Sequence, residues 1–257
     1  MALYEDSQSD FLKSLGSVLG DAMDVVKAKY SNTKEIADVR EAFETMLREG
    51  EDGFVPLAYS GGGQPLVTVL NTVVNGVAKY AFVNTAIFVG SPVFGSITNP
   101  NVKNVINLYG SMDQMVGLNM VYNNNFKGER TDLKQYNIVL EGLTHTDYFV
   151  NPEDYAQKTQ QLKTLKEQLV ILEQNPVLNA ISIAKHKEDI GSIERMFYAD
   201  AFVARLTAAS KSEFRLSQFI DQINPDNKPL ASVNLNEWIH GSGLTIEEII
   251  SRKKRPL

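Results

Sequence analysis

The chain has 257 residues, of which 43% are hydrophobic and 22% are charged, as in an ordinary globular protein with a sizeable core. Its net charge of −6 argues against a general polyanion-binding protein, because phosphate backbones require a concentrated positive surface. The absence of cysteine excludes disulfides, thiolate metal sites and a cysteine nucleophile.

The first 50 residues predict two amphipathic helices. Apolar residues recur every three or four positions from Leu12 to Val26, and the stretch from Thr33 to Arg48 repeats this spacing. Acidic residues stand near the start of the chain where a signal peptide needs basic ones, so we expect no targeting by this N-terminus. No apolar run reaches the ~20 residues that span a bilayer.

From Phe54 to about residue 150, short apolar segments predict the strands of a sheet. They are FVPLAYS, AFVNTAIFVGSP, VKNVINLYGS and YNIVLEGLTH, and each ends near a glycine and polar residues. A helix is expected after the first strand, from Pro65 through the apolar positions up to Val77. Strands that are apolar on both faces indicate a parallel sheet covered on both sides, and ligands bind at the carboxyl ends of such strands.

Beyond Pro152 the pattern predicts helices throughout. Leucines between positions 162 and 172 recur at spacings of three and four, and further helical stretches follow. The last one, LTIEEIISRKK, has Thr245 as its expected N-cap and Glu248 as the partner in a capping box. We therefore expect an α/β core over residues 1–152 and an all-helical C-terminal domain over residues 153–257. The C-terminal RKKRP resembles a nuclear-import or anionic-lipid patch, but we expect it to be a solvated tail.

Ser60 is the candidate nucleophile. It stands in AYSGG between an expected strand and an expected helix, and Ala58 and Gly62 provide the small neighbours that a strained nucleophile-bearing turn needs. The N–H of Gly61 is the expected first oxyanion-hole donor, at the start of a helix that favours negative charge. Similar glycine-rich turns bind phosphate, but here no P-loop motif and no adjacent lysine favour that interpretation.

A serine nucleophile needs a histidine base and a carboxylate that orients the base. His145 is the only one of the three histidines that is expected on the same rim as Ser60, because His186 lies in a charged helical segment and His240 lies near the end of the chain. Asp113 stands at a strand end between Ser60 and His145, which gives the order serine, aspartate, histidine.

Other acids and neighbours of this rim remain candidates. Asp147, two residues after the histidine, and Asp132, in a polar loop, are the alternative acids, and Glu129 and Glu141 are less well placed. Four residues would shape an apolar substrate pocket or serve only in packing: Tyr59, Gln64, Met112 and Tyr148. The histidines are scattered and no metal-binding motif occurs, so we expect no metal and no cofactor.

The segments YSGGG, IFVGSP, LYGSMDQMV and GLTHTDYF together resemble the nucleophile, acid and histidine segments of the α/β-hydrolase superfamily, in its lipase and esterase branch. The similarity covers roughly residues 33–150, with Ala58 where that family most often has glycine. It implies that Ser60 is the nucleophile, Asp113 the orienting acid and His145 the base, and that the substrates are carboxylic esters of small molecules or lipids.

The early strands of this family, and the loop that supplies its second oxyanion donor, are not evident in residues 1–50. Three explanations remain open. The chain is the C-terminal portion of a longer protein, with the early strands supplied by a further domain or chain. The fold is reduced, and Gly61–Gly63 or the N-terminal helical region supplies the donor. The protein is a non-catalytic hydrolase-like scaffold whose helical C-terminal region docks a partner.

Overall fold

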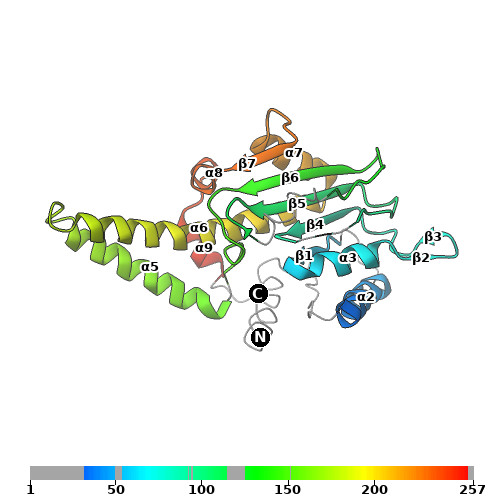
Figure 1. The fold of residues 1–257 in the computed structure, drawn as a ribbon, viewed down its shortest axis with the longest axis horizontal. Helices are drawn as coiled ribbons and strands as arrows, with labels where there is room; N and C mark the ends of the chain where they lie inside the picture. The colour runs from blue at the N-terminus through cyan, green and yellow to red at the C-terminus, as the bar shows by residue number, and fades with distance from the viewer. Residues whose placement is uncertain are drawn as a thin grey trace.

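The computed structural model describes residues 32–49, 54–91, 93, 95–114, 125–150 and 152–253. Its centre is a five-stranded, fully parallel sheet with the strand order β1-β4-β5-β6-β7 (Figure 1). The strands are β1 (Leu57–Tyr59), β4 (Thr85–Val89), β5 (Asn104–Gly110), β6 (Lys134–Leu140) and β7 (Leu230–Val233). The α/β class and the parallel sheet expected from the apolar strands are confirmed, whereas the helix expected around Leu12–Val26 lies outside the described residues.

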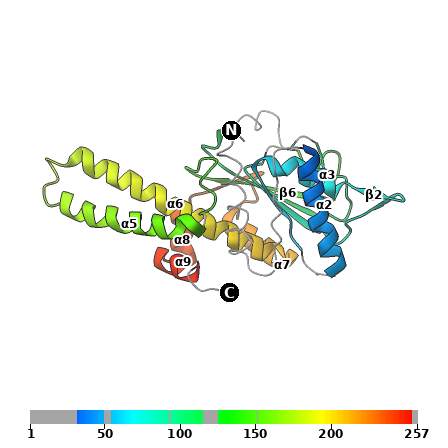
Figure 2. The ribbon, with the colours of Figure 1, turned by 90° about the horizontal axis from the view of Figure 1, so that it is seen from below.

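Helices cover both faces of this sheet (Figures 1 and 2). On one side lie α2 (Asn32–Glu49) and α3 (Gly63–Leu70); on the other lie the second half of α6 (Ala180–Ser210), α7 (Glu213–Ile223) and α8 (Leu235–Ser242). Among the described residues, two further helices are α5 (Pro152–Leu172) and α9 (Ile246–Lys253). None of the described helices combines the length and the hydrophobicity that spanning a bilayer requires.

The strand β4 shows how the sequence produces the two covered faces. Ile87 and Val89 belong to the core under α6 and α7, whereas Ala86 and Phe88 belong to the core under α2 and α3. Successive side chains of a strand point to opposite faces, so a strand buried on both faces reads as a continuous apolar run. This is why the apolar run before Gly90 predicts a central strand correctly.

The helix expected from Pro65 to Val77 is wrong in its second half. The helix α3 ends at Leu70, and β2 (Val73–Val74) and β3 (Val77–Ala78) form a separate two-stranded hairpin. Asn75 and Gly76 join these strands with positive φ angles of 52° and 79°, as a tight two-residue hairpin turn requires. The turn chemistry of Asn-Gly therefore prevails over the helical spacing of the valines.

The expectation of an all-helical region after residue 152 is also wrong. The strand β7 pairs in parallel with β6, in a register that places Leu230 opposite Asn137 and Val233 opposite Leu140. The C-terminal residues therefore complete the sheet and cover one of its faces. The sequence pattern misses β7 because it is only four residues long and lies at the sheet edge, with only Ala231 and Val233 buried.

The start of α9 follows the predicted capping box. Thr245 Oγ1 accepts a hydrogen bond from the Glu248 N–H at 3.2 Å, and Glu248 Oε2 accepts one from the Thr245 N–H at 2.9 Å. Both N–H groups at the helix start are thus satisfied, as the reciprocal motif predicts.

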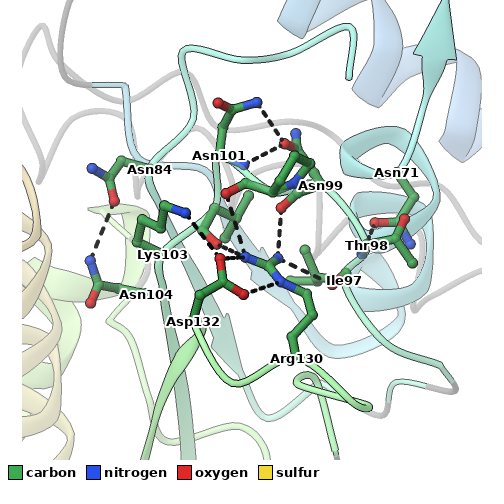
Figure 3. A network of polar contacts seen from close by, with 12 residues as sticks. Asn71, Asn84, Ile97, Thr98, Asn99, Asn101, Lys103, Asn104, Arg130 and Asp132 are labelled. Carbon is green, nitrogen blue, oxygen red and sulfur yellow. Dashed lines mark hydrogen bonds and ion pairs between the residues drawn. The ribbon is translucent and has the colours of Figure 1, made fainter. Parts of the chain in front are cut away.

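A polar network ties together the loops at the amino ends of β5 and β6 (Figure 3). The Arg130 guanidinium donates to the carbonyl oxygens of Asn99 at 2.6 Å and Val102 at 2.9 Å, and it pairs with Asp132 at 2.8 Å. Arg130 and Lys103 together hold the pKa of the Asp132 carboxyl well below its usual range. Asp132 therefore pairs with Arg130 and Lys103 at the edge of the sheet opposite the predicted site. The alternative that Asp132 is the acid beside His145 is wrong.

Candidate active site

Ser60 follows β1 directly on a strained turn. Its φ angle of +50° lies in the left-handed region, which residues other than glycine rarely adopt. The chain continues through a 3-10 turn, η1 (Ser60–Gly62), into α3, and Ala58 and Gly62 on either side are buried. Such strain persists only where the surrounding structure enforces it, and it is concentrated at functional sites.

Three strand ends bring together Ser60, Asp113 and His145. His145 Nε2 lies 2.9 Å from Ser60 Oγ, and His145 Nδ1 lies 3.1 Å and 3.0 Å from the two carboxylate oxygens of Asp113. The three residues follow β1, β5 and β6, whose carboxyl ends share one edge because the sheet is parallel. Ser60 and His145 are 85 positions apart in the sequence, and Asp113 and His145 are 32 positions apart. The three side chains nevertheless form one hydrogen-bonded chain from hydroxyl to carboxylate.

This hydrogen-bonded chain is shielded from water. Ser60 is 2% exposed, the Asp113 side chain is fully buried, and the His145 side chain is 13% exposed. An ionised carboxylate only accepts hydrogen bonds, so the contact with Asp113 requires a proton on His145 Nδ1. In the neutral ring, Nε2 is then left as the acceptor for the Ser60 hydroxyl. The arrangement can therefore remove a proton from Ser60.

Tyr148 contacts the Asp113 carboxylate as well. Its side chain is fully buried; its hydroxyl donates to Asp113 Oδ2 and accepts a hydrogen bond from the Gly110 N–H at 2.6 Å. Burial and the neighbouring carboxylate raise the pKa of Tyr148 well above its usual range, so the hydroxyl stays protonated and keeps its donor. The sequence suggests Tyr148 as a substrate-pocket residue, but its side chain is buried and contacts the Asp113 carboxylate instead.

Tyr59 supports the histidine. Its ring stacks on the imidazole of His145, with centroids 5.2 Å apart and ring planes 20° apart, and its hydroxyl donates to the His145 carbonyl oxygen at 2.6 Å. Because Tyr59 immediately precedes Ser60, one segment of chain positions both the hydroxyl and the imidazole. The sequence suggested a pocket or packing role for this residue, and the contacts assign it to positioning His145.

Gly90, at the end of β4, provides the space for the acid. Its φ angle is +52°, and a Cβ atom at this position would lie 2.9 Å from both Asp113 Oδ2 and Tyr148 Cε2. Only glycine meets both conditions without strain. The sequence marks Gly90 as a strand end, but the reason for a glycine depends on neighbours that are distant in the chain.

The other predicted residues lie on the same rim. Gly61 follows Ser60 within η1, Gln64 lies in the first turn of α3, and both are half-buried. Met112, next to Asp113, is 60% exposed. The N-terminal region considered as a source of the second oxyanion donor lies mostly outside the described residues.

The alternative acid Asp147 forms hydrogen bonds within the turn from Thr144 to Asp147. Its Oδ2 accepts hydrogen bonds from the Thr144 N–H at 2.8 Å and from Thr144 Oγ1 at 2.7 Å. The His145 ring instead contacts Asp113, so the structure distinguishes two acids that the sequence left open. His186 lies elsewhere and contacts Gln168 at 3.1 Å.

Among the described ranges, no group of three or more histidine, aspartate or glutamate side chains is arranged to hold a metal ion. Comparison of the chain with protein-family models, with curated proteins and with solved structures finds no match. The chemistry of this protein is therefore inferred from the geometry around Ser60, Asp113 and His145.

Proposed function

We propose that the protein is a serine hydrolase that cleaves carboxylic esters through an acyl-enzyme on Ser60. The observation that carries the proposal is the continuous hydrogen-bonded chain from Ser60 Oγ through the His145 ring to the Asp113 carboxylate. The strained φ angle of Ser60 and the small residues around it support the same assignment. A buried serine with a merely structural role needs none of these features.

In the first half of the reaction, Ser60 Oγ attacks the ester carbonyl carbon while His145 Nε2 takes the hydroxyl proton. Asp113 stabilises the resulting imidazolium through Nδ1–H, and the Gly61 N–H donates to the oxyanion of the tetrahedral intermediate. The intermediate collapses as the C–O bond to the alcohol breaks and His145 returns its proton to the leaving oxygen. The acyl group is then esterified to Ser60.

In the second half, a water molecule replaces the alcohol. His145 removes a proton from the water as it attacks the acyl carbon, and the proton then passes to Ser60 Oγ as the acyl–serine bond breaks. The products are a carboxylic acid and the free enzyme. Tyr148 and Tyr59 act as positioning residues throughout, because they contact the acid and the histidine rather than the reacting atoms.

A fluorophosphonate probe, which phosphonylates activated serines, tests the proposal directly. Wild-type protein should be labelled, and Ser60→Ala should not. The matched control is Ser91→Ala, at the end of the neighbouring strand β4. Ser91 is also buried, but its Oγ donates to the backbone carbonyls of Ala58 and Val89, both at 3.2 Å. This control should keep full labelling.

The two candidate acids provide a second test. Asp113→Asn should slow labelling by several orders of magnitude, since loss of the orienting carboxylate in a triad costs on the order of 10⁴-fold. Asp147→Asn should change the rate less than about threefold, because Asp147 bonds only within its own turn in the contacts described above. A folded wild-type protein that takes up no probe would rule out the hydrolase and favour the non-catalytic scaffold.

A further inference from the structure

The helices α5 and α6 form an antiparallel hairpin whose turn lies at the end of the molecule farthest from the β2–β3 hairpin (Figures 1 and 2). Aliphatic side chains at this turn face solvent: Val170 and Ile171 are each 64% exposed, Val177 is 89%, Leu178 is 87% and Ile181 is 88%. We call these five residues the hairpin tip. Large apolar side chains exposed together at one turn of a globular protein are candidates for an interaction site.

The distal part of the hairpin stands clear of the body. Between Leu162 and Ile190, a stretch that the structure describes completely, no residue is buried. Polar contacts hold the two helices together there: Lys187 pairs with Glu173 at 2.8 Å, and Asn179 Nδ2 donates to the Leu172 carbonyl at 3.0 Å. The exposed side chains of the tip therefore contribute no core packing to the fold.

Charge is depleted around the tip. From Gln168 to Ala184 the only charged residue is Glu173, and its carboxylate is neutralised by Lys187. By contrast, 22% of the whole chain is charged. A stretch that is both aliphatic and uncharged matches a hydrocarbon phase. The nearest lysines on α6, Lys185 and Lys187, lie beyond this stretch, and Lys187 is paired with Glu173.

The composition and size of the tip argue against a protein partner or a second copy. Stable protein interfaces use about 20–30 residues a side, and their strongest contacts come from tryptophan, tyrosine and arginine. The tip has five aliphatic residues and none of those three types between Gln168 and Ala184. It lies at the turn of a projecting hairpin, which suits shallow insertion into a soft apolar layer.

We propose that the hairpin tip inserts into the boundary between headgroups and acyl chains of a lipid bilayer and anchors the protein on uncharged, zwitterionic lipid surfaces. The anchor does not depend on Ser60, which follows β1 in the body of the protein. Binding is expected to persist at high salt, because no charge pairing with the lipid is involved.

The absence of native cysteine allows a clean test with the intact protein. Leu178→Cys, labelled with an environment-sensitive fluorophore such as NBD, should shift to the blue and brighten when phosphatidylcholine vesicles are added, in low or high salt. The matched control is Val77→Cys on the β2–β3 hairpin, which is 66% exposed at the opposite end of the molecule, and it should not respond.

Vesicle flotation measures the contribution of the tip. Leu178→Ser with Ile181→Ser should lower the partition coefficient at least tenfold, since each fully buried aliphatic side chain contributes about that factor. Val73→Ser with Val77→Ser should leave it unchanged. Ser60→Ala should float like the wild type, so membrane binding is scored separately from hydrolysis. Absent vesicle binding by the wild type, or equal losses in both double variants, would overturn the proposal. So would a concentration-dependent self-association that depends on Leu178 and occurs without lipid binding.

Discussion

Replacing Tyr148 by phenylalanine removes a single oxygen atom from behind the Asp113 carboxylate. The hydroxyl donates to a fully buried carboxylate, and a hydrogen bond to a charged group contributes about 1.5–3 kcal/mol. The Gly110 N–H also loses its acceptor, and an unsatisfied buried donor costs about 1–3 kcal/mol. We therefore expect Tyr148→Phe to lower the free energy of unfolding by about 2.5–6 kcal/mol.

The same substitution should slow the chemical step without weakening substrate binding. Asp113 keeps its contacts with the His145 ring but loses one restraint, so kcat for ester hydrolysis should fall about tenfold, or about 1.4 kcal/mol in activation free energy. KM should not change, because Tyr148 is fully buried. Urea denaturation measures the stability, and steady-state ester hydrolysis separates kcat from KM.

Tyr80→Phe is the matched control. Tyr80 is also fully buried, and its hydroxyl donates to a carboxylate, that of Glu44 on α2, at 2.8 Å. This variant should lose stability and keep its kcat. If Tyr148→Phe kept the wild-type unfolding free energy, the inferred hydrogen bonds would be absent. A raised KM with unchanged kcat would instead mean that Tyr148 contacts the substrate.

Three further outcomes follow from the geometry. Gly90→Ala should lower the free energy of unfolding by about 2–3 kcal/mol and slow probe labelling, because its Cβ would lie 2.9 Å from the buried Asp113 carboxylate at a φ of +52°. In the control Gly76→Ala the Cβ has open space, so the loss should be about 1 kcal/mol and labelling should not change. In urea titrations, Arg130→Lys should cost about 1–2 kcal/mol, because lysine cannot reproduce the forked bonds to the loop carbonyls. Hydrogen bonding by Lys79 holds the pKa of Glu44 below its ordinary value of 4.5. The contribution of Glu44 to stability is therefore complete above that value and is lost as the pH falls through the lower pKa. Glu44→Gln should reduce this loss of stability in acid.

The features that the sequence predicts correctly depend on residues that are close together in the chain. The runs before Gly90 and Gly110 predict β4 and β5 because burial on both faces leaves a continuous apolar signature. The capping box of Thr245 and Glu248 lies within four residues. Where two local signals compete, as helical spacing and the turn at Asn75 do, the spacing alone misleads.

The sequence alone predicts the tight turn at Ser60, His145 as the histidine on the same rim, and the parallel sheet that puts both on one edge. Each of these follows from a short run of residues and the alternation of side chains along a strand. Three features are visible only in the folded chain: His145 contacts Asp113 rather than Asp147, Tyr148 binds the Asp113 carboxylate, and β7 completes the sheet. The physical reason is that these contacts depend on strand register and on the packing of side chains tens of residues apart, which no local pattern specifies.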